Sequence, residues 1–299
     1  MQKMLSKFIR HLWKMNTNFL RLSSGEDIFY TYKKNVNNSK NLLFIHGNYA
    51  TSYIWTDIYQ SCKEIYNVYG LDLRGFGRSS YKTPARQMKT YARDVVEFVC
   101  KLNLKNLTII AWSAGGAVAM ETLKELRGYL NEIYLVDSIS TRGYDSPYRI
   151  YLDINKYTRN LFPMIDFYTN DLNPYQKIEN FIPSYDEAEK YFSKYLFNFT
   201  RPKELFLKKI AREMLLQRNN LDFWEAMTNF RMDKSVLEEN KIPIKVIWGA
   251  YDKIISQEDT EEILEDFNFK AKFIKFNKSG HAPFIDQKAE FLELLYIKK

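Results

Sequence analysis

The chain has few of the features that would assign it to a special class. It has two cysteines in 299 residues, Cys62 and Cys100, in unrelated segments without metal-ligand or redox spacing, which indicates a reduced, cytoplasmic protein. No apolar run is long enough to span a bilayer, and charges interrupt every candidate core of a signal peptide. Lysine and arginine total 44 against 36 acidic residues, but the two signs are interleaved, so no nucleic-acid partner is expected.

The N-terminal segment, residues 1–16, predicts an amphipathic helix. Its apolar side chains recur at helical spacing, and lysines and an arginine occupy the other positions. Such a helix could lie on a membrane surface, although docking onto the protein's own surface is the stronger expectation. Its apolar stripe consists of Met4, Leu5, Phe8, Ile9, Leu12 and Trp13.

Most of the chain alternates between short apolar runs and helical patterns. Residues 18–22 and 28–33 flank a Ser-Ser-Gly-Glu turn and predict a hairpin. An amphipathic helix is expected from Tyr91 to Val99, and another from Gln257 to Phe267. The alternation predicts an α/β protein with a mostly parallel sheet. The further strands are expected at 41–45, 66–71, 107–110, 132–136, 242–249 and 271–276.

Between about residues 140 and 240 the pattern changes. Strands become hard to find, and Phe, Tyr and Leu recur at helical spacing among charged residues. We interpret this segment as a helical cap inserted into an α/β core. The expected division is therefore a first core part with the N-terminal helix and hairpin (1–139), a cap (140–240) and a second core part (241–299).

The stretch from Leu107 to Gly116 predicts a strand that turns sharply into a helix. Ser113 occupies the corner, where a strained backbone would present its hydroxyl and would require small neighbours. An ordinary N-cap serine is the alternative interpretation. The small neighbours are Ala111, Ala114, Gly115 and Gly116.

Three further loops follow other predicted strands. His46-Gly47-Asn48 follows the strand 41–45, Asp252 lies in a Gly-x-x-Asp turn after 242–249, and Gly280-His281 follows 271–276. Together with the small-x-Ser-x-Gly corner, these loops resemble the α/β-hydrolase family. Here Ala111 replaces the usual first glycine of the serine motif, which makes the turn tighter.

The resemblance implies an eight-stranded α/β-hydrolase sheet flanked by helices, with the cap after the sixth strand. It implies a catalytic triad of Ser113, Asp252 and His281, in that family's chain order. The oxyanion hole would consist of the backbone N–H groups of Asn48 and Ala114. His46 would be a structural residue beneath this loop, and the segment 72–79 would brace the loops around the site.

Two competing assignments remain. Asp137 also ends a strand at the same edge of the sheet and is a second candidate for the acid, although loop context and the resemblance favour Asp252. The glycines of residues 72–79 lack the spacing of a phosphate-binding loop, so nucleotide binding is not expected. A serine at the corner also argues against epoxide hydrolase or dehalogenase chemistry, because those relatives carry aspartate there.

The resemblance implies a carboxylic ester hydrolase that acts through an acyl-enzyme on Ser113 and needs no metal or cofactor. The expected partner is a small, apolar acyl substrate bound under the aromatic cap. An acyltransferase or peptidase on the same scaffold and a triad-bearing ligand receptor remain as alternatives, and the sequence leaves the oligomeric state open.

Overall fold

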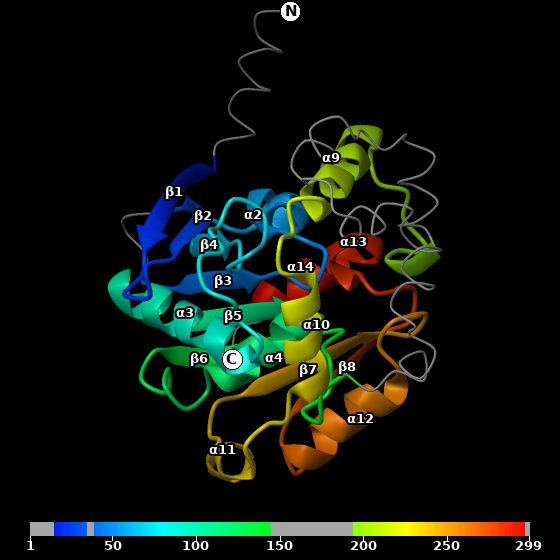
Figure 1. The fold of residues 1–299 in the computed structure, drawn as a ribbon. Helices are drawn as coiled ribbons and strands as arrows, with labels where there is room; N and C mark the ends of the chain where they lie inside the picture. The colour runs from blue at the N-terminus through cyan, green and yellow to red at the C-terminus, as the bar shows by residue number, and fades with distance from the viewer. Residues whose placement is uncertain (1–14, 35–38, 145–193, 297–299) are drawn as a thin grey trace, which may run out of the picture.

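The computed structural model describes residues 15–34, 39–144 and 194–296. These residues form one eight-stranded sheet with the strand order β1-β2-β4-β3-β5-β6-β7-β8 (Figure 1). The strands are β1 (Asn16–Arg21), β2 (Asp27–Lys33), β3 (Asn41–Ile45), β4 (Asn67–Leu71), β5 (Leu107–Trp112), β6 (Leu130–Val136), β7 (Ile244–Gly249) and β8 (Lys272–Phe276).

The sheet is antiparallel at one edge and parallel elsewhere. β1 and β2 form the expected hairpin, β2 pairs antiparallel with β4, and every pairing from β4 to β8 is parallel. All five residues of β3 are buried, as an apolar strand covered on both faces requires. The mostly parallel sheet predicted from the sequence is therefore confirmed, and the carboxyl ends of β3, β5, β6, β7 and β8 share one edge.

Helices cover both faces of this sheet. Successive residues of β5 point to opposite faces, so that Ile109 packs in one apolar cluster and Ile110 in the other. Helices α3 (Met88–Lys101), α4 (Ala114–Glu121) and α12 (Gln257–Asp266) contribute to the first cluster. The second cluster includes α2 (Thr56–Ser61), α13 (Pro283–Asp286) and α14 (Lys288–Tyr296), and α2 follows the short 3-10 helix η1 (Ser52–Trp55).

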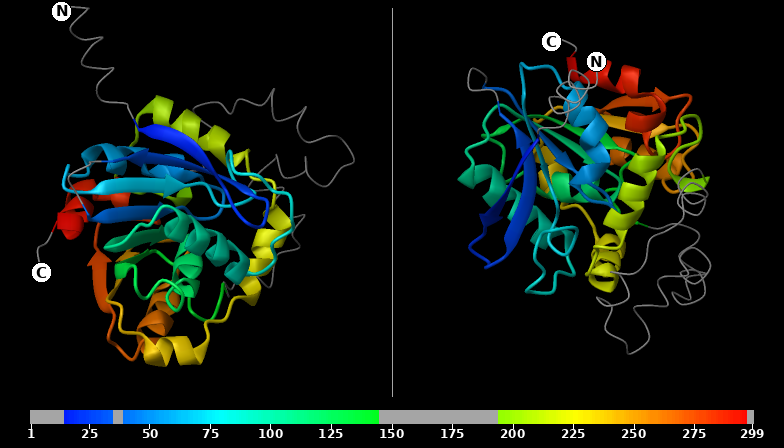
Figure 2. Two further views of the ribbon diagram at one scale, coloured as in Figure 1. Left: turned by 90° about the vertical axis from the view of Figure 1, so that its left-hand side faces the viewer. Right: turned by 90° about the horizontal axis from the view of Figure 1, so that it is seen from above.

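The described part of the insert between β6 and β7 is helical. It contains α9 (Glu204–Met214), α10 (Asn220–Asn229) and α11 (Lys234–Glu239) (Figures 1 and 2). Helix α9 packs in the second cluster and α10 in the first, so the insert contacts both sides of the sheet. Phe223 of α10 packs edge-on against Phe76 and Tyr91 of the core. The remainder of the expected cap (145–193) and the expected N-terminal helix lie outside the described residues, so the division into core and cap stays a prediction.

Within the described ranges, every helix is too short or too polar to cross a lipid bilayer.

Candidate active site

Ser113 occupies the corner between β5 and α4. Its backbone has φ 55° and ψ −129°, a conformation that a residue with a side chain rarely adopts and that is typical of functional sites. Ser113 is the N-cap of α4, but its hydroxyl makes no capping hydrogen bond, which contradicts the alternative of an ordinary capping serine. Because neighbouring loops cover the corner, the residue is only 8% exposed.

The corner is packed so closely that glycine is required on two sides. A Cβ atom on Gly47 would lie 2.7 Å from the Cβ of Ser113, and one on Gly115 would lie 2.5 Å from the carbonyl oxygen of His46. Ala111, the departure from the usual glycine, is fully buried without disturbing β5. The small residues predicted around the serine therefore bring the loop after β3 against it.

We call Gly47, Asn48 and Tyr49 the oxyanion loop, after the role that the family resemblance implies for it. It follows β3, and Tyr49 has φ 55°, in the left-handed region. Beneath it, the fully buried ring of His46 bonds through Nδ1 to the carbonyl oxygen of Gly47 at 2.8 Å, and Nε2 accepts the N–H of Leu73 at 3.0 Å. Burial lowers the pKa of His46 to about 4, so its ring is neutral at pH 7. As expected, His46 supports the loop.

His281 and Asp252 come together after β8 and β7. Nδ1 of His281 lies 2.7 Å from Oδ2 of Asp252, and the two side chains are 3% and 0% exposed. The other oxygen of Asp252 accepts the N–H groups of Ile254 at 2.7 Å and Ile255 at 3.1 Å. Both carboxylate oxygens are thus engaged, which fixes the carboxylate and orients the imidazole.

Asp137 follows β6 beside this pair, in a different environment. One of its oxygens accepts the N–H of Gly249 at 2.8 Å, whereas the other is buried and has no hydrogen-bond partner in the described part of the chain. Burial and the neighbouring Asp252 raise the pKa of Asp137 well above its usual value. Of the two acids, Asp252 is the one within hydrogen-bond distance of the His281 ring, which favours Asp252 as the orienting residue.

The same three side chains are the candidate metal ligands of the described residues. Single donor atoms of Asp137, Asp252 and His281 all lie within 4.8 Å of one another. However, two ligands bound to one tetrahedral ion at about 2.1 Å lie about 3.4 Å apart. The 2.7 Å between Asp252 and His281 is shorter and fits a shared proton better than a shared cation.

The turn after β4 braces the loops around the site, as expected. Asp72 is fully buried and accepts the N–H groups of Ser52 at 2.8 Å and Arg78 at 3.1 Å. Arg74 forms a buried ion pair with Asp94 at 2.5 Å. These contacts join the turn to η1, which follows the oxyanion loop, and to α3.

Comparison with known proteins identifies the family of the chain. The family model described as the alpha/beta hydrolase fold matches residues 40–288. The chain belongs to the α/β-hydrolase family. The family match confirms the resemblance found in the sequence, and the observed sheet has the eight strands that the resemblance implied.

Individual relatives of this α/β-hydrolase are distant. Lipase 3 of Moraxella sp. (strain TA144) is 24% identical over 284 residues, which cover 89% of this chain and 79% of the lipase. A protein named "Probable alcohol acetyltransferase" from Cyberlindnera fabianii is 31% identical over 94 residues, 30% of this chain and only 24% of that protein. An esterase from Exiguobacterium antarcticum has the same fold, with a TM-score of 0.67, 18% identity and coverage of 94% and 98% of the two chains.

Sequence reasoning missed three side chains that hold the candidate site. Trp112 donates from Nε1 to the carbonyl oxygen of His281 at 2.6 Å, which anchors the histidine loop beside the serine corner. Asp286 accepts the N–H of Gly280 at 2.8 Å and that of Phe199, in the insert, at 3.0 Å. Gln217 of the insert bonds to the oxyanion loop. Only Trp112 lay inside a recognised motif, as the residue before Ser113, so sequence alone offered no signal for the other two.

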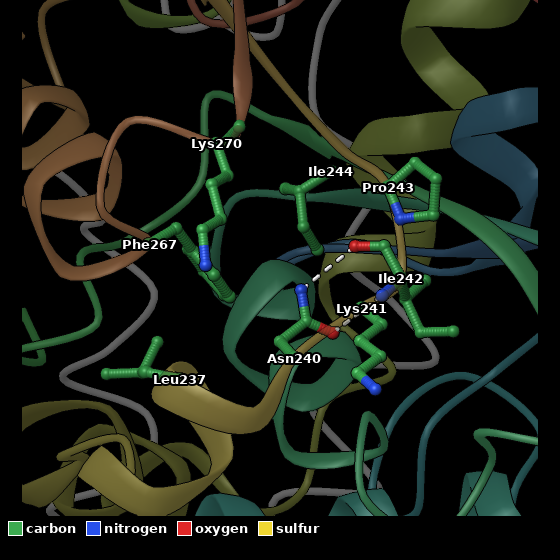
Figure 3. A pocket seen from close by; sticks show the side chains of 9 residues that line it. Leu237, Asn240, Lys241, Ile242, Pro243, Ile244, Phe267 and Lys270 are labelled. Carbon is green, nitrogen blue, oxygen red and sulfur yellow. Dashed lines mark hydrogen bonds between the residues drawn. The ribbon is translucent and has the colours of Figure 1, made fainter.

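A cavity of about 250 Å³ lies elsewhere, at the amino end of β7 (Figure 3). Ile244, Pro243 and Phe267 line it, and the amide of Asn240 closes one side by bonding to both the N–H and the C=O of Ile242. The candidate catalytic residues follow the carboxyl ends of the strands, about 17 Å away along a six-residue strand. This cavity is therefore separate from the candidate active site.

Proposed function

We propose that this α/β-hydrolase is a serine hydrolase that cleaves a carboxylic ester through an acyl-enzyme on Ser113. The observation that carries the proposal is the buried 2.7 Å contact between Asp252 and His281, at the sheet edge that also bears the strained Ser113 corner. The lipase and esterase similarities support the same reaction class.

In the proposed reaction, neutral His281 accepts the proton of the Ser113 hydroxyl as its oxygen attacks the carbonyl carbon. Asp252 holds the Nδ1 proton and stabilises the imidazolium that forms. The backbone N–H groups of Asn48 and Ala114 bind the developing oxyanion. His281 returns the proton to the leaving alcohol, and water then hydrolyses the acyl group from Ser113.

The substrate side is proposed from the insert. We infer that residues 140–240 form a cap over the site and bind a small, largely apolar acyl substrate, since the segment is rich in aromatic residues. A cytoplasmic location is also proposed, because Cys62 and Cys100 are both free.

Acyl transfer is the second candidate, favoured by the similarity to the acetyltransferase. It uses the same acyl-enzyme and differs only in whether water or an alcohol attacks it. A fluorophosphonate label mapped to Ser113 by mass spectrometry tests the acyl-enzyme. Turnover of p-nitrophenyl acetate with added ethanol then separates the two fates, because transfer yields ethyl acetate and hydrolysis yields acetate. Labelling without turnover of any ester would instead support a ligand receptor.

A further inference from the structure

The insert contacts the oxyanion loop through Gln217. Oε1 of Gln217 accepts the backbone N–H of Tyr49 at 2.9 Å, and Nε2 donates to Oδ1 of Asn48 at 2.8 Å. Gln217 is 1% exposed, so both bonds are sheltered from water. A second insert residue, Trp224, donates from Nε1 to the hydroxyl of Tyr49 at 3.0 Å. Two consecutive residues of the loop are thus held from outside the sheet.

The oxyanion loop needs such support because of its backbone. Tyr49 has φ 55°, which is disfavoured for a residue with a Cβ and persists only where surrounding contacts hold it. His46 holds the start of the loop through the carbonyl oxygen of Gly47. Gln217 holds its end, and relaxation of Tyr49 would also turn Asn48, whose N–H must point at the oxyanion.

The residues around Gln217 fasten the same segment to the core. Glu213 accepts the hydroxyl of Thr51 at 3.0 Å and pairs with Arg78 at 3.0 Å. Although burial opposes its ionisation, Lys209 and Arg78 hold the pKa of Glu213 below its usual value, so these bonds persist at pH 7. Arg218 donates to the carbonyl oxygen of Gly77 at 2.9 Å. The segment 213–218 therefore spans the loops that follow β3 and β4.

We propose that Gln217 is a positioning residue that fixes the oxyanion loop in its catalytic conformation. The oxyanion hole then depends on specific bonds from the insert, because Gln217 holds Asn48 and Tyr49 directly. This inference rests on the proposed function, in which the N–H of Asn48 stabilises the oxyanion.

The test compares Gln217→Met with Arg218→Met in the full-length protein. Methionine keeps the length of the side chain and removes its hydrogen bonds. Arg218 is the matched control, since its side chain fastens the same segment without touching the oxyanion loop. For both variants we would measure kcat and KM on a p-nitrophenyl ester, the inhibition constant of a boronic acid that mimics the tetrahedral intermediate, and hydrogen exchange of the peptide that contains Asn48 and Tyr49.

Gln217→Met is expected to lower kcat about 10- to 100-fold, while KM changes by less than about threefold. The inhibition constant of the boronic acid should rise by a factor similar to the loss in kcat. Exchange at the oxyanion loop should accelerate, while exchange at the His281 loop stays unchanged. Arg218→Met should keep kcat within about threefold of the parent protein.

Three results would overturn the inference: unchanged exchange at the loop in Gln217→Met, faster exchange with unchanged kcat, or an equal loss of kcat in both variants. A different result would contradict the proposed function: ester turnover that persists in Ser113→Ala. In that case the exchange measurement still decides whether Gln217 holds the loop.

Discussion

Asp252 and His281 stand 29 positions apart in the chain, yet Oδ2 of the carboxylate lies 2.7 Å from Nδ1 of the imidazole. Their loops follow the neighbouring strands β7 and β8, which run parallel, so both side chains reach the same edge. Trp112, one residue before Ser113, binds the carbonyl oxygen of His281. The serine corner and the histidine loop are thus joined directly, and the following predictions test what this arrangement does.

Ser113→Ala should abolish ester hydrolysis and fluorophosphonate labelling, because the variant lacks the attacking oxygen. Its melting temperature should stay close to that of the parent protein, since the hydroxyl makes no capping bond. Ester turnover, labelling and thermal unfolding check the three statements. Ser61→Ala, an exposed-face hydroxyl on α2, is the control and should change none of them. Parent-level turnover in Ser113→Ala would exclude Ser113 as the nucleophile.

Asp252→Asn should lower kcat by about 10³- to 10⁴-fold, because an amide opposite Nδ1 favours the wrong imidazole tautomer. Asp137→Asn should cost less than about fivefold, since asparagine has the shape of a neutral carboxylic acid and can still accept the N–H of Gly249. Steady-state kinetics on one ester compares the two. The reverse ranking would assign the acid to Asp137.

The ratio kcat/KM should fall as the pH is lowered, because only neutral His281 accepts the proton of Ser113. The measurement is a pH series on a substrate for which the chemical step limits the rate. A profile that stays flat down to pH 4 would argue against His281 as the base.

The free energy of unfolding should fall in mild acid because of His46. Its pKa is lowered to about 4 in the folded protein, whereas an unfolded histidine has a pKa of about 6.5. The unfolded state therefore binds the extra proton first, and the free energy of unfolding should fall by about 1.6 kcal/mol between pH 6.5 and pH 5 from this group alone. The loss should level off below pH 4.

Urea unfolding of the parent protein and His46→Gln at both pH values measures this contribution. The variant should be less stable at neutral pH, because it disturbs the bonds to Gly47 and Leu73, but its stability should depend less on pH. Identical pH slopes would show that His46 does not carry the effect.

The length of the acyl chain should affect kcat/KM if the insert forms an apolar roof. Each methylene buried there is worth about 0.8 kcal/mol, or about fourfold in kcat/KM. A series of p-nitrophenyl esters from acetate upward should therefore rise to an optimum at the length that fills the pocket. A steady decline from acetate onward would exclude an apolar acyl pocket and favour a small or polar substrate.

Local sequence was sufficient for most of the sheet. The apolar run 41–45 is a strand with the expected bounds, and the hairpin, β5, β7 and α12 lie where the pattern of apolar residues predicted them. Small residues around Ser113 predicted a sharp corner, because only small side chains allow a strained backbone and a close neighbouring loop. The short helices α2, α13 and α14 were not anticipated, since they carry weak periodicity and are stabilised by packing on the sheet.

The sequence by itself determined the strands and the edge of the sheet at which the chemistry-bearing loops meet, because short-range patterning sets strands and parallel pairing aligns their ends. Only the tertiary structure showed how the environments of the two acids differ: both oxygens of Asp252 are engaged, whereas the second oxygen of Asp137 has no hydrogen-bond partner among the described residues. It alone brought Gln217 to Tyr49, 168 positions away, because contacts between distant segments depend on how the insert packs on the core and leave no local pattern in the chain.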